Sequence, residues 1–239
     1  MRKICVFVEG QTEQIFVREF LLKWFEYAHV SLECHQIIGS QTKGAEYDYS
    51  NPDADYHYQI VNVGNDNRVL SWLLDRVEGL KREGFELIVG LRDMYGKYYR
   101  KKSSYIDSEL NMLIISAAYE EIQERLKGDA AMVSFHFAIM EIEAWMLAMY
   151  PSLLKKFPSI TEDDLKTIYD IDDDVEQTIY HPADTLNKVF NIVGSAYEKH
   201  KSDANSIMKY MEKMDFEVLL QSGKSQTFKN FVKALVPMS

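Results

Sequence analysis

The order of apolar and polar residues along the first half of the chain switches repeatedly between two periods. Runs of β-branched and aromatic residues bounded by turn-forming residues are typical of strands, and they span 3–8, 32–38, 56–63, 85–91 and 131–137. Between these runs, apolar residues recur every three or four positions, which predicts helices. This spacing is clearest at Phe16, Phe20 and Trp24, over 69–80 and over 106–126.

The second half of the chain has only the helical pattern. Its predicted helices cover 141–150, 161–171, 183–199, 207–220 and 227–235. Strands that alternate with helices, followed by helices alone, predict an α/β fold with a mainly parallel sheet and an α-helical C-terminal layer. We expect an α/β domain over 1–150 and a helical extension over 151–239, with a long loop at 39–55.

Composition limits the class of protein. A chain of 239 residues with 46% hydrophobic content can bury a sizeable core. It contains no apolar run long enough to span a membrane and no signal-peptide cleavage site, so we expect a cytoplasmic protein without a membrane partner. Cys5 and Cys34 both lie in predicted strands and are expected to be reduced and buried. No pattern in the sequence predicts an oligomeric state.

The net charge of −10 argues against a protein that binds nucleic acid through bulk positive charge. One local patch is an exception, because four cations are interleaved with Tyr98 and Tyr99; they are Lys97, Arg100, Lys101 and Lys102. The patch can hold a phosphate backbone while tyrosines stack on bases. The alternative is an exposed polar loop whose cations offset the surrounding acidity.

Two predicted strands end in a carboxylate that is soon followed by glycine. Glu9 and Gly10 follow the first strand, and Asp93 follows the strand at 85–91. The carboxyl ends of parallel strands meet at one edge of a sheet, so we expect these two carboxylates to lie together. Carboxylate oxygens are ligands that Mg²⁺ prefers, so the pair predicts a metal site. The alternative is that the acids and glycines only form turns.

Glu13 lies four residues after Glu9, in the first turn of a helix that we expect Thr12 to cap. Its carboxylate can face the same metal or a water molecule. The alternative is that it only offsets the positive end of the helix dipole.

Glu141 and Glu143 stand at the start of a predicted helix that is otherwise almost wholly apolar. Burying a carboxylate is costly unless it is paired or bound to a metal, so these acids are candidate ligands. Residues two apart cannot share a helix face, and we expect Glu143 to point inward.

Three short motifs resemble those of the Toprim domain, which topoisomerases, primases and OLD-type nucleases share. They are V-E-G-Q-T-E at 8–13, the strand-end acid Asp93 and E-x-E-A at 141–144. The sequence is most similar to a bacterial branch of Toprim-like proteins that has E-G-x-T-E, D-x-Y-G and E-x-E-A motifs. His181-Pro182 and Tyr197-Glu198-Lys199 also resemble the C-terminal region of that branch.

The resemblance implies a mainly parallel four-stranded sheet with flanking helices. It also implies an acidic edge that binds Mg²⁺ or Mn²⁺ and cuts or joins nucleic-acid backbones. If the roles of the Toprim residues apply to the matching positions, Glu9 is a general acid/base or metal ligand, Glu13 is the second acid, and Asp93 is a metal ligand. Tyr95 stands where the usual D-x-D motif has its second acid. Glu141 or Glu143 must therefore complete the site.

We therefore expect a metal-dependent nuclease with nucleic acid as its partner. Relatives of this branch are often encoded beside an AAA-type ATPase and are suspected of anti-phage defence, so such an ATPase is a second expected partner. The competing interpretation is a non-catalytic binding or regulatory subunit on a degenerate Toprim scaffold, favoured by Tyr95 and the acidic composition. A phosphatase or nucleotide hydrolase would share the metal chemistry and stays open.

Overall fold

The computed structural model describes residues 1–39, 41–44, 47–64 and 68–237. The chain divides into two compact units, each built from several chain segments. The first comprises 1–92, 108–137 and 234–236, and the second comprises 93–107, 138–233 and 237–239. The predicted boundary at residue 150 therefore remains a prediction. Within the described residues, no helix combines the length and the apolar character needed to cross a lipid bilayer.

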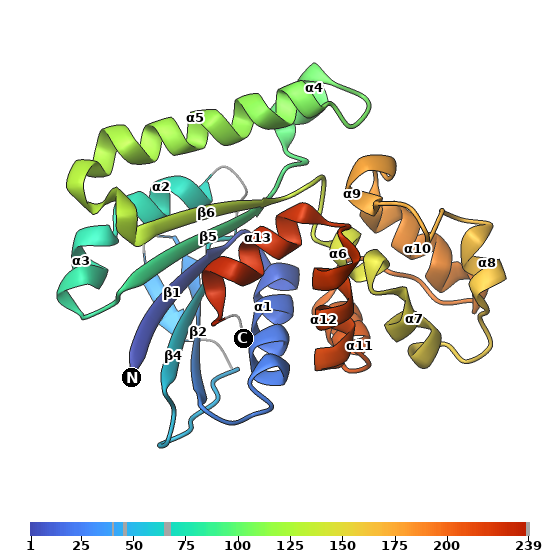
Figure 1. The fold of residues 1–239 in the computed structure, drawn as a ribbon, viewed down its shortest axis with the longest axis horizontal. Coiled ribbons are helices and arrows are strands. Elements are labelled where there is room, and N and C mark those ends of the chain that lie inside the picture. The colour runs from blue at the N-terminus through green and yellow to red at the C-terminus, as the bar shows by residue number, and fades with distance from the viewer. Residues whose placement is uncertain (40, 45–46, 65–67, 238–239) are drawn as a thin grey trace. The chain divides into compact units, whose positions relative to one another are not determined.

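The first unit is built on a six-stranded sheet (Figure 1). Its strands are β1 (Arg2–Val8), β2 (Val30–Ile38), β3 (Gln41–Gly44), β4 (Tyr56–Asn62), β5 (Leu87–Asp93) and β6 (Val133–Ala138). Their order across the sheet is β3-β2-β4-β1-β5-β6. β1 pairs in parallel with both β4 and β5, β2 pairs in parallel with β4, and β3 is antiparallel to β2.

The mainly parallel α/β sheet is confirmed, but the prediction of four strands is wrong. β3 lies inside the segment 39–55 that was predicted as a loop. It is a short edge strand whose residues are all exposed. Such an edge has no apolar pattern to reveal it, because none of its side chains is buried. β6 is the other additional strand, and its apolar run at 131–137 was detected in the sequence.

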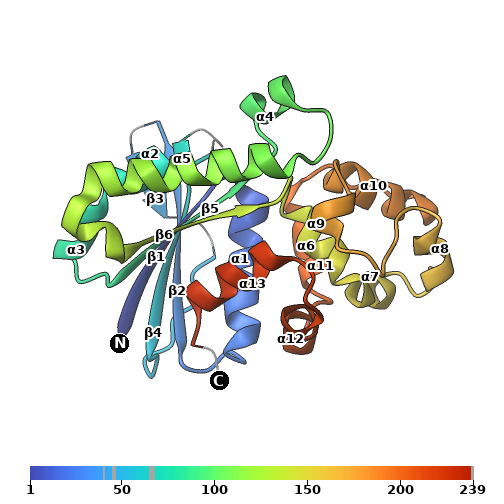
Figure 2. The same cartoon turned by 45° about the horizontal axis from the view of Figure 1, so that its top comes forward.

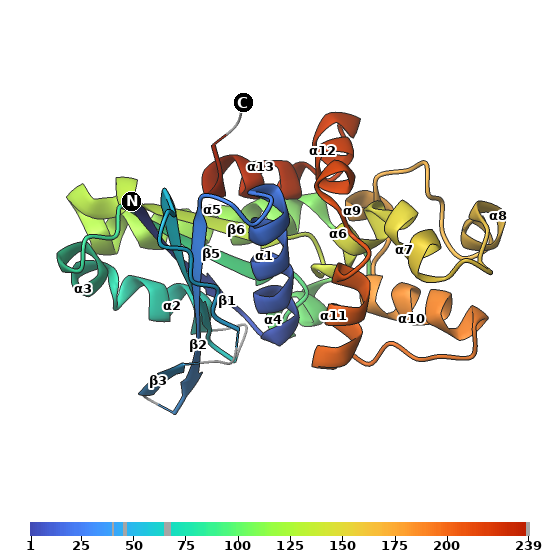
Figure 3. The same ribbon diagram turned by 90° about the horizontal axis from the view of Figure 1, so that it is seen from below.

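Helices cover both faces of this sheet. α1 (Gln11–Trp24) contacts β2 and β4, while α2 (Val69–Leu74) and α3 (Val77–Arg82) lie on the opposite face (Figure 3). The long helix α5 (Ser108–Leu126) packs against α2 and is followed by a 3₁₀ segment, Lys127–Met132 (Figure 2). Because β1 is covered by helices and flanked by two strands, its sequence is a continuous apolar run.

The second unit is helical. It contains α4 (Lys97–Lys102), α6 (Glu143–Ala148), α7 (Tyr150–Lys156), α8 (Glu162–Lys166), α9 (Val175–Thr178), α10 (Pro182–Ile192), α11 (Lys201–Met208), α12 (Lys213–Ser222) and most of α13 (Gln226–Leu235). The indole of Trp145 is fully buried in this unit, and its ring packs against Phe228 and Phe231 with centroids 5.3 and 5.6 Å apart.

Several predicted helices are shorter or divided in the structure. The helix predicted over 69–80 breaks at 75–76, between α2 and α3. Pro151 does not end a helix but lies in the first turn of α7, where its missing N–H costs nothing. The helix predicted over 207–220 is divided between α11 and α12. Helical spacing reports which residues face the core, and short helices in succession can produce the same spacing.

Candidate metal centre

Asp93 is the last residue of β5 and is 6% exposed. Its Oδ1 accepts a hydrogen bond from the backbone N–H of Ile142 at 2.9 Å. The two residues after Asp93 bond to the end of β6 and to the turn that follows it, because Met94 and Tyr95 donate their N–H groups to the carbonyls of Ala138 and Met140. These bonds hold the Asp93 carboxylate beside the start of α6.

Glu141 and Glu143 reach the same place from the turn that follows β6. Met140 has a φ of +61°, a value that non-glycine residues rarely adopt, and α6 begins only at Glu143. Glu141 therefore precedes the helix. The argument that the two acids cannot share a face was wrong because it assumed that both were helical. Glu143 points inward as predicted and is fully buried.

Oxygen atoms of Asp93, Glu141 and Glu143 all lie within 4.8 Å of one another. A cluster of three carboxylates at this spacing can hold a metal ion, because hard oxygen ligands are what Mg²⁺ and Mn²⁺ prefer. The structure thus brings together Asp93, which was predicted at the end of a strand, and Glu141 and Glu143, which were predicted at the start of a helix. We call this group the acid cluster.

Residues after α10 and at its start complete the surroundings of the acid cluster. The ammonium of Lys199 lies 2.8 Å from Glu141 Oε1 and 3.2 Å from Glu143 Oε2. The Tyr197 hydroxyl donates to Glu143 Oε1 at 2.8 Å, and the Ala183 N–H, in the first turn of α10, donates to Glu141 Oε2 at 2.9 Å. Each glutamate is therefore held in a defined orientation.

The carboxylates of the acid cluster and Lys199 shift one another's ionisation. Burial raises the pKa of Glu143, and the nearby charge of Lys199 opposes this effect. Burial lowers the pKa of Lys199, but the carboxylates of Glu143, Asp93 and Glu141 more than reverse that and hold it above its ordinary value. Counted by themselves, these three carboxylates and one ammonium carry two surplus negative charges when all are ionised. A divalent cation would neutralise this surplus.

Glu9 and Glu13 belong to the first unit, whereas the acid cluster belongs to the second. Glu9 directly follows β1, and Glu13 is buried in the first turn of α1. The helix is capped at Gly10 and not at Thr12, with Glu13 Oε2 lying 3.0 Å from where a side-chain Cβ on Gly10 would sit. Participation of Glu9 and Glu13 in the metal site remains a prediction.

The cations Lys97, Arg100, Lys101 and Lys102 lie on α4, and all four are exposed. The alternative interpretation was right that these residues are exposed, but they form a short helix and not a loop. A six-residue helix with two tyrosines and four cations has no apolar stripe, so periodicity could not reveal it.

The aromatic residues near the acid cluster form a second group. Tyr95 packs edge-to-face against Tyr180 and His181, with ring centroids 5.4 and 5.1 Å apart, and the Arg100 guanidinium lies over the Tyr95 ring at 5.6 Å. Sequence reasoning missed the roles of Tyr197, Lys199 and the Ala183 N–H. Only the similarity of the His-Pro and Tyr-x-Lys motifs to a Toprim-like branch pointed to this region.

Comparison with known proteins identifies a family for this chain. No curated protein matches the chain, and no solved structure matches it. A family model described as "Domain of unknown function (DUF4276)" matches residues 8–236, a range that includes the acid cluster and α4. The match extends over almost the whole sequence, and the chain therefore belongs to the DUF4276 family.

Proposed function

We propose that this protein is a Toprim-like, metal-dependent nuclease that cleaves phosphodiester bonds of nucleic acids. The observation that carries the proposal is the convergence of Asp93, Glu141 and Glu143 within 4.8 Å of one another. In this proposal the ion is Mg²⁺ or Mn²⁺, the enzyme acts in the cytoplasm, and an AAA-type ATPase partner and a role in phage defence follow from the same resemblance.

The acid cluster fits a divalent cation by its donor chemistry and by its charge. All three candidate ligands are carboxylates, and within the described part of the chain the buried Glu143 Oε2 accepts no hydrogen bond and has the Lys199 ammonium 3.2 Å away. Leaving such an oxygen with only an ion pair to Lys199 is unfavourable, since buried charges need full compensation. When bound, the ion would supply polarisation of the phosphodiester and a lowered pKa of bound water.

The protein's own residues would orient this chemistry. Tyr197 and the Ala183 N–H hold the two glutamates, and the Ile142 N–H holds Asp93. Such hydrogen bonds fix the direction of metal ligands, and removing one typically lowers metal affinity or activity by about 10- to 100-fold. Glu9 and Glu13 enter the proposal as further acids, with Glu9 as general acid/base or ligand. The cations of α4 would bind the nucleic-acid backbone.

The test is cleavage of plasmid DNA, single-stranded DNA and RNA with Mg²⁺ or Mn²⁺, and with EDTA. We expect cleavage that needs the metal and falls at least about tenfold in Asp93→Asn and in Glu141→Gln. Glu124→Gln is the matched control, because Glu124 is an exposed acid of α5 in the other unit. Activity that persists in both cluster variants would overturn the assignment. Parallel Glu9→Gln and Glu13→Gln variants test whether those acids take part.

One observation favours the competing function, a non-catalytic binding or regulatory subunit. The ammonium of Lys199 already bridges Glu141 and Glu143, as a built-in cation would. Titration calorimetry with Mg²⁺ and Mn²⁺ separates the two functions. A nuclease site binds metal in the wild-type protein and loses binding in Asp93→Asn. No binding at millimolar metal in the wild type, with metal binding recovered in Lys199→Met, would favour the regulatory subunit.

A further inference from the structure

One face of α4 combines a flat aromatic ring with two positive charges. Tyr98 is 50% exposed, and Lys101 and Lys102 lie three and four residues later, so the three side chains share a helix face. The Lys102 ammonium lies 5.9 Å from the centre of the Tyr98 ring. Such an exposed cation–π contact is worth little, so a nucleobase can take the place of the ammonium at low cost.

A second exposed ring follows on an ordered loop. Tyr105 is 63% exposed, yet its backbone is fixed by Ser103, whose Oγ donates to the Tyr105 carbonyl at 2.8 Å and accepts from the Tyr105 N–H at 3.2 Å. The buried Tyr99 holds the end of the loop by accepting the Asp107 N–H on its hydroxyl at 2.7 Å. An aromatic ring that is exposed on a rigid loop is preorganised for stacking, which lowers the entropic cost of binding.

Contacts within the second unit tie this surface to the acid cluster. The Tyr180 hydroxyl donates to the Ser103 carbonyl at 2.7 Å, and Arg100 lies over Tyr95. Tyr95 in turn packs on His181, which directly precedes α10. Two residues after His181, the Ala183 N–H binds Glu141. Tyr95, which stands where Toprim proteins have an acid, therefore links the basic helix to the metal ligands.

We propose that α4 and the loop after it form a binding surface for an unpaired nucleic-acid strand. The bases would stack on Tyr98 and Tyr105, and the phosphates would pair with the four cations of α4, so that the strand continues toward the acid cluster. The binding surface stands on the contacts above. Its role as a substrate channel rests on the proposed nuclease function.

An unpaired strand fits this surface better than a duplex does. Stacking on a protein ring needs a base whose face is free, and in a duplex each face is covered by the neighbouring base pair. The cations extend over a helix of only about 9 Å, at 1.5 Å per residue, in a protein with a net charge of −10. So short a patch neutralises few duplex phosphates, whereas stacking adds affinity that does not depend on charge.

The test is fluorescence anisotropy of the full chain with a short oligothymidylate, an oligouridylate and a duplex of equal length, all in EDTA so that no cleavage occurs. We expect single strands to bind at least about tenfold more tightly than the duplex. Tyr98→Ala and Tyr105→Ala should each weaken single-strand binding at least about fivefold, since base–aromatic stacking is lost. Tyr98→Phe and Tyr105→Phe should restore it, because the ring is kept.

The salt dependence of binding tests the phosphate contacts, and a tyrosine outside the proposed surface provides the control. For a single strand, four phosphate contacts predict that the logarithm of the association constant falls with the logarithm of the salt concentration with a slope of about −3. The double variant Lys101→Ala/Lys102→Ala should bring this slope about 1.4 closer to zero. Tyr27→Ala is the control, because Tyr27 is 49% exposed in the first unit and should leave binding unchanged.

The outcomes separate this inference from the nuclease proposal. Duplex binding as tight as single-strand binding, or tyrosine variants that bind like the wild type, would overturn the binding surface even if cleavage occurs. Tyrosine-dependent single-strand binding without any metal-dependent cleavage would support the surface and remove the nuclease function.

Discussion

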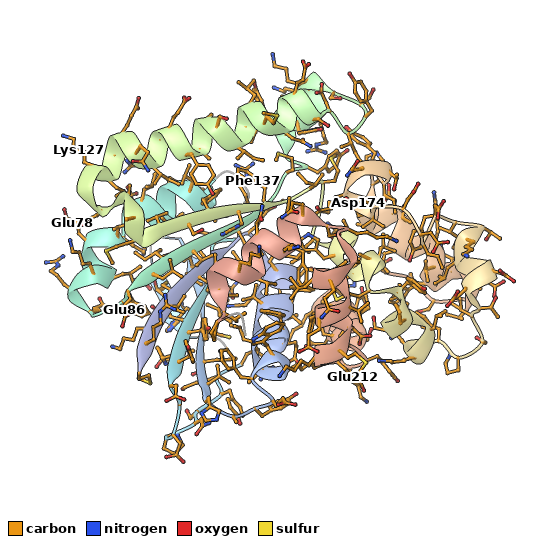
Figure 4. The ribbon with its side chains drawn as sticks, viewed as in Figure 1. Glu78, Glu86, Lys127, Phe137, Asp174 and Glu212 are labelled. Atoms are coloured by element: carbon orange, nitrogen blue, oxygen red, sulfur yellow. The ribbon has the colours of Figure 1, made fainter. Side chains whose placement is uncertain are left out.

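Glu176 shows how one buried residue can make stability depend on pH. In the second unit its Oε1 accepts hydrogen bonds from the Trp145 indole N–H at 2.8 Å and from the Thr227 hydroxyl, and its Oε2 accepts from the Thr227 N–H. Asp174, labelled in Figure 4, fixes the same region by accepting the N–H groups of Glu176 and Ser225. Burial raises the pKa of Glu176 to about 7, against the opposing effect of the bonds from Thr227 and Trp145.

The folded protein should therefore lose stability between about pH 4.5 and 7. In that range the folded state keeps a proton on Glu176 that the unfolded state has released, so the contribution is complete at low pH and is lost as pH rises. One such group changes the free energy of unfolding by about 1.4 kcal/mol per pH unit. Urea denaturation at pH 5 and pH 8 should show that the free energy of unfolding of Glu176→Gln falls by about 2 to 3 kcal/mol less between these pH values than that of the wild type.

The control for this prediction is Glu124→Gln, whose free energy of unfolding should fall between pH 5 and pH 8 by as much as that of the wild type. Glu143, whose pKa is also raised by burial, contributes equally to all three proteins. A Glu176→Gln variant with the full wild-type decline would show that Glu176 does not titrate in this range.

The residue scale also explains why the acid cluster could only be predicted in part. The acids themselves are visible in the sequence, because a carboxylate in an apolar run is unusual. Their shared position depends on the left-handed turn at Met140 and on Lys199, which lies more than fifty residues from either glutamate. Met140 carries no turn signal, since non-glycine residues rarely adopt a positive φ.

At the scale of elements, β5 and β6 approach each other closely around a glycine. A side-chain Cβ on Gly90 would overlap the ring of Phe135 and lie 3.1 Å from Leu73 Cδ1 of α2. Phe135 is buried, so it has little room to move. Gly90 therefore lets the Phe135 ring of β6 lie directly over the β5 backbone, with α2 close by.

Gly90→Ala should lower the free energy of unfolding by about 1 to 3 kcal/mol, as overpacking of a well-filled core does. Urea denaturation measures the change. Gly79→Ala is the matched control, since a Cβ there meets nothing within 4 Å and alanine favours the helix; we expect no loss and up to about 1 kcal/mol of gain. Combining Gly90→Ala with Phe135→Leu should recover part of the loss. A neutral Gly90→Ala would contradict the close approach.

At the scale of the whole molecule, the order of segments along the chain does not match the division into units. The chain passes from one unit to the other after residues 92, 107, 137, 233 and 236. The second unit includes Asp93 from the first half of the sequence and Lys199 from the second. A fragment that ends at the predicted domain boundary keeps the three acids of the cluster but lacks Lys199, which is paired with two of them.

A fragment of residues 1–150 should leave 138–150 poorly ordered. It lacks Lys199 and Tyr197, which hold the glutamates, and Phe228 and Phe231, which cover Trp145. Hydrogen exchange with mass spectrometry should show fast exchange at 138–150 in the fragment and protection in the full chain. β1 is the internal control, because its parallel partners β4 and β5 are present in both. Equal protection of 138–150 in the two proteins would support an independent domain ending at 150.

Features that depend on neighbouring residues could be predicted from the sequence alone. Apolar runs predicted five strands of the mainly parallel sheet, and acids were located at Glu9, Asp93, Glu141 and Glu143. These signals are local, since a strand or a turn is encoded within a few positions. Elements without an apolar stripe, such as β3 and α4, were missed for the same reason.

Which of these acids lie together, and what surrounds them, depends on how distant parts of the chain fold against one another. The tertiary structure brought Asp93, Glu141 and Glu143 into one group with Lys199, and it connected α4 to that group through Tyr95 and His181. These contacts join residues up to about a hundred positions apart, and their geometry depends on the path of the whole chain. No local pattern carries that information.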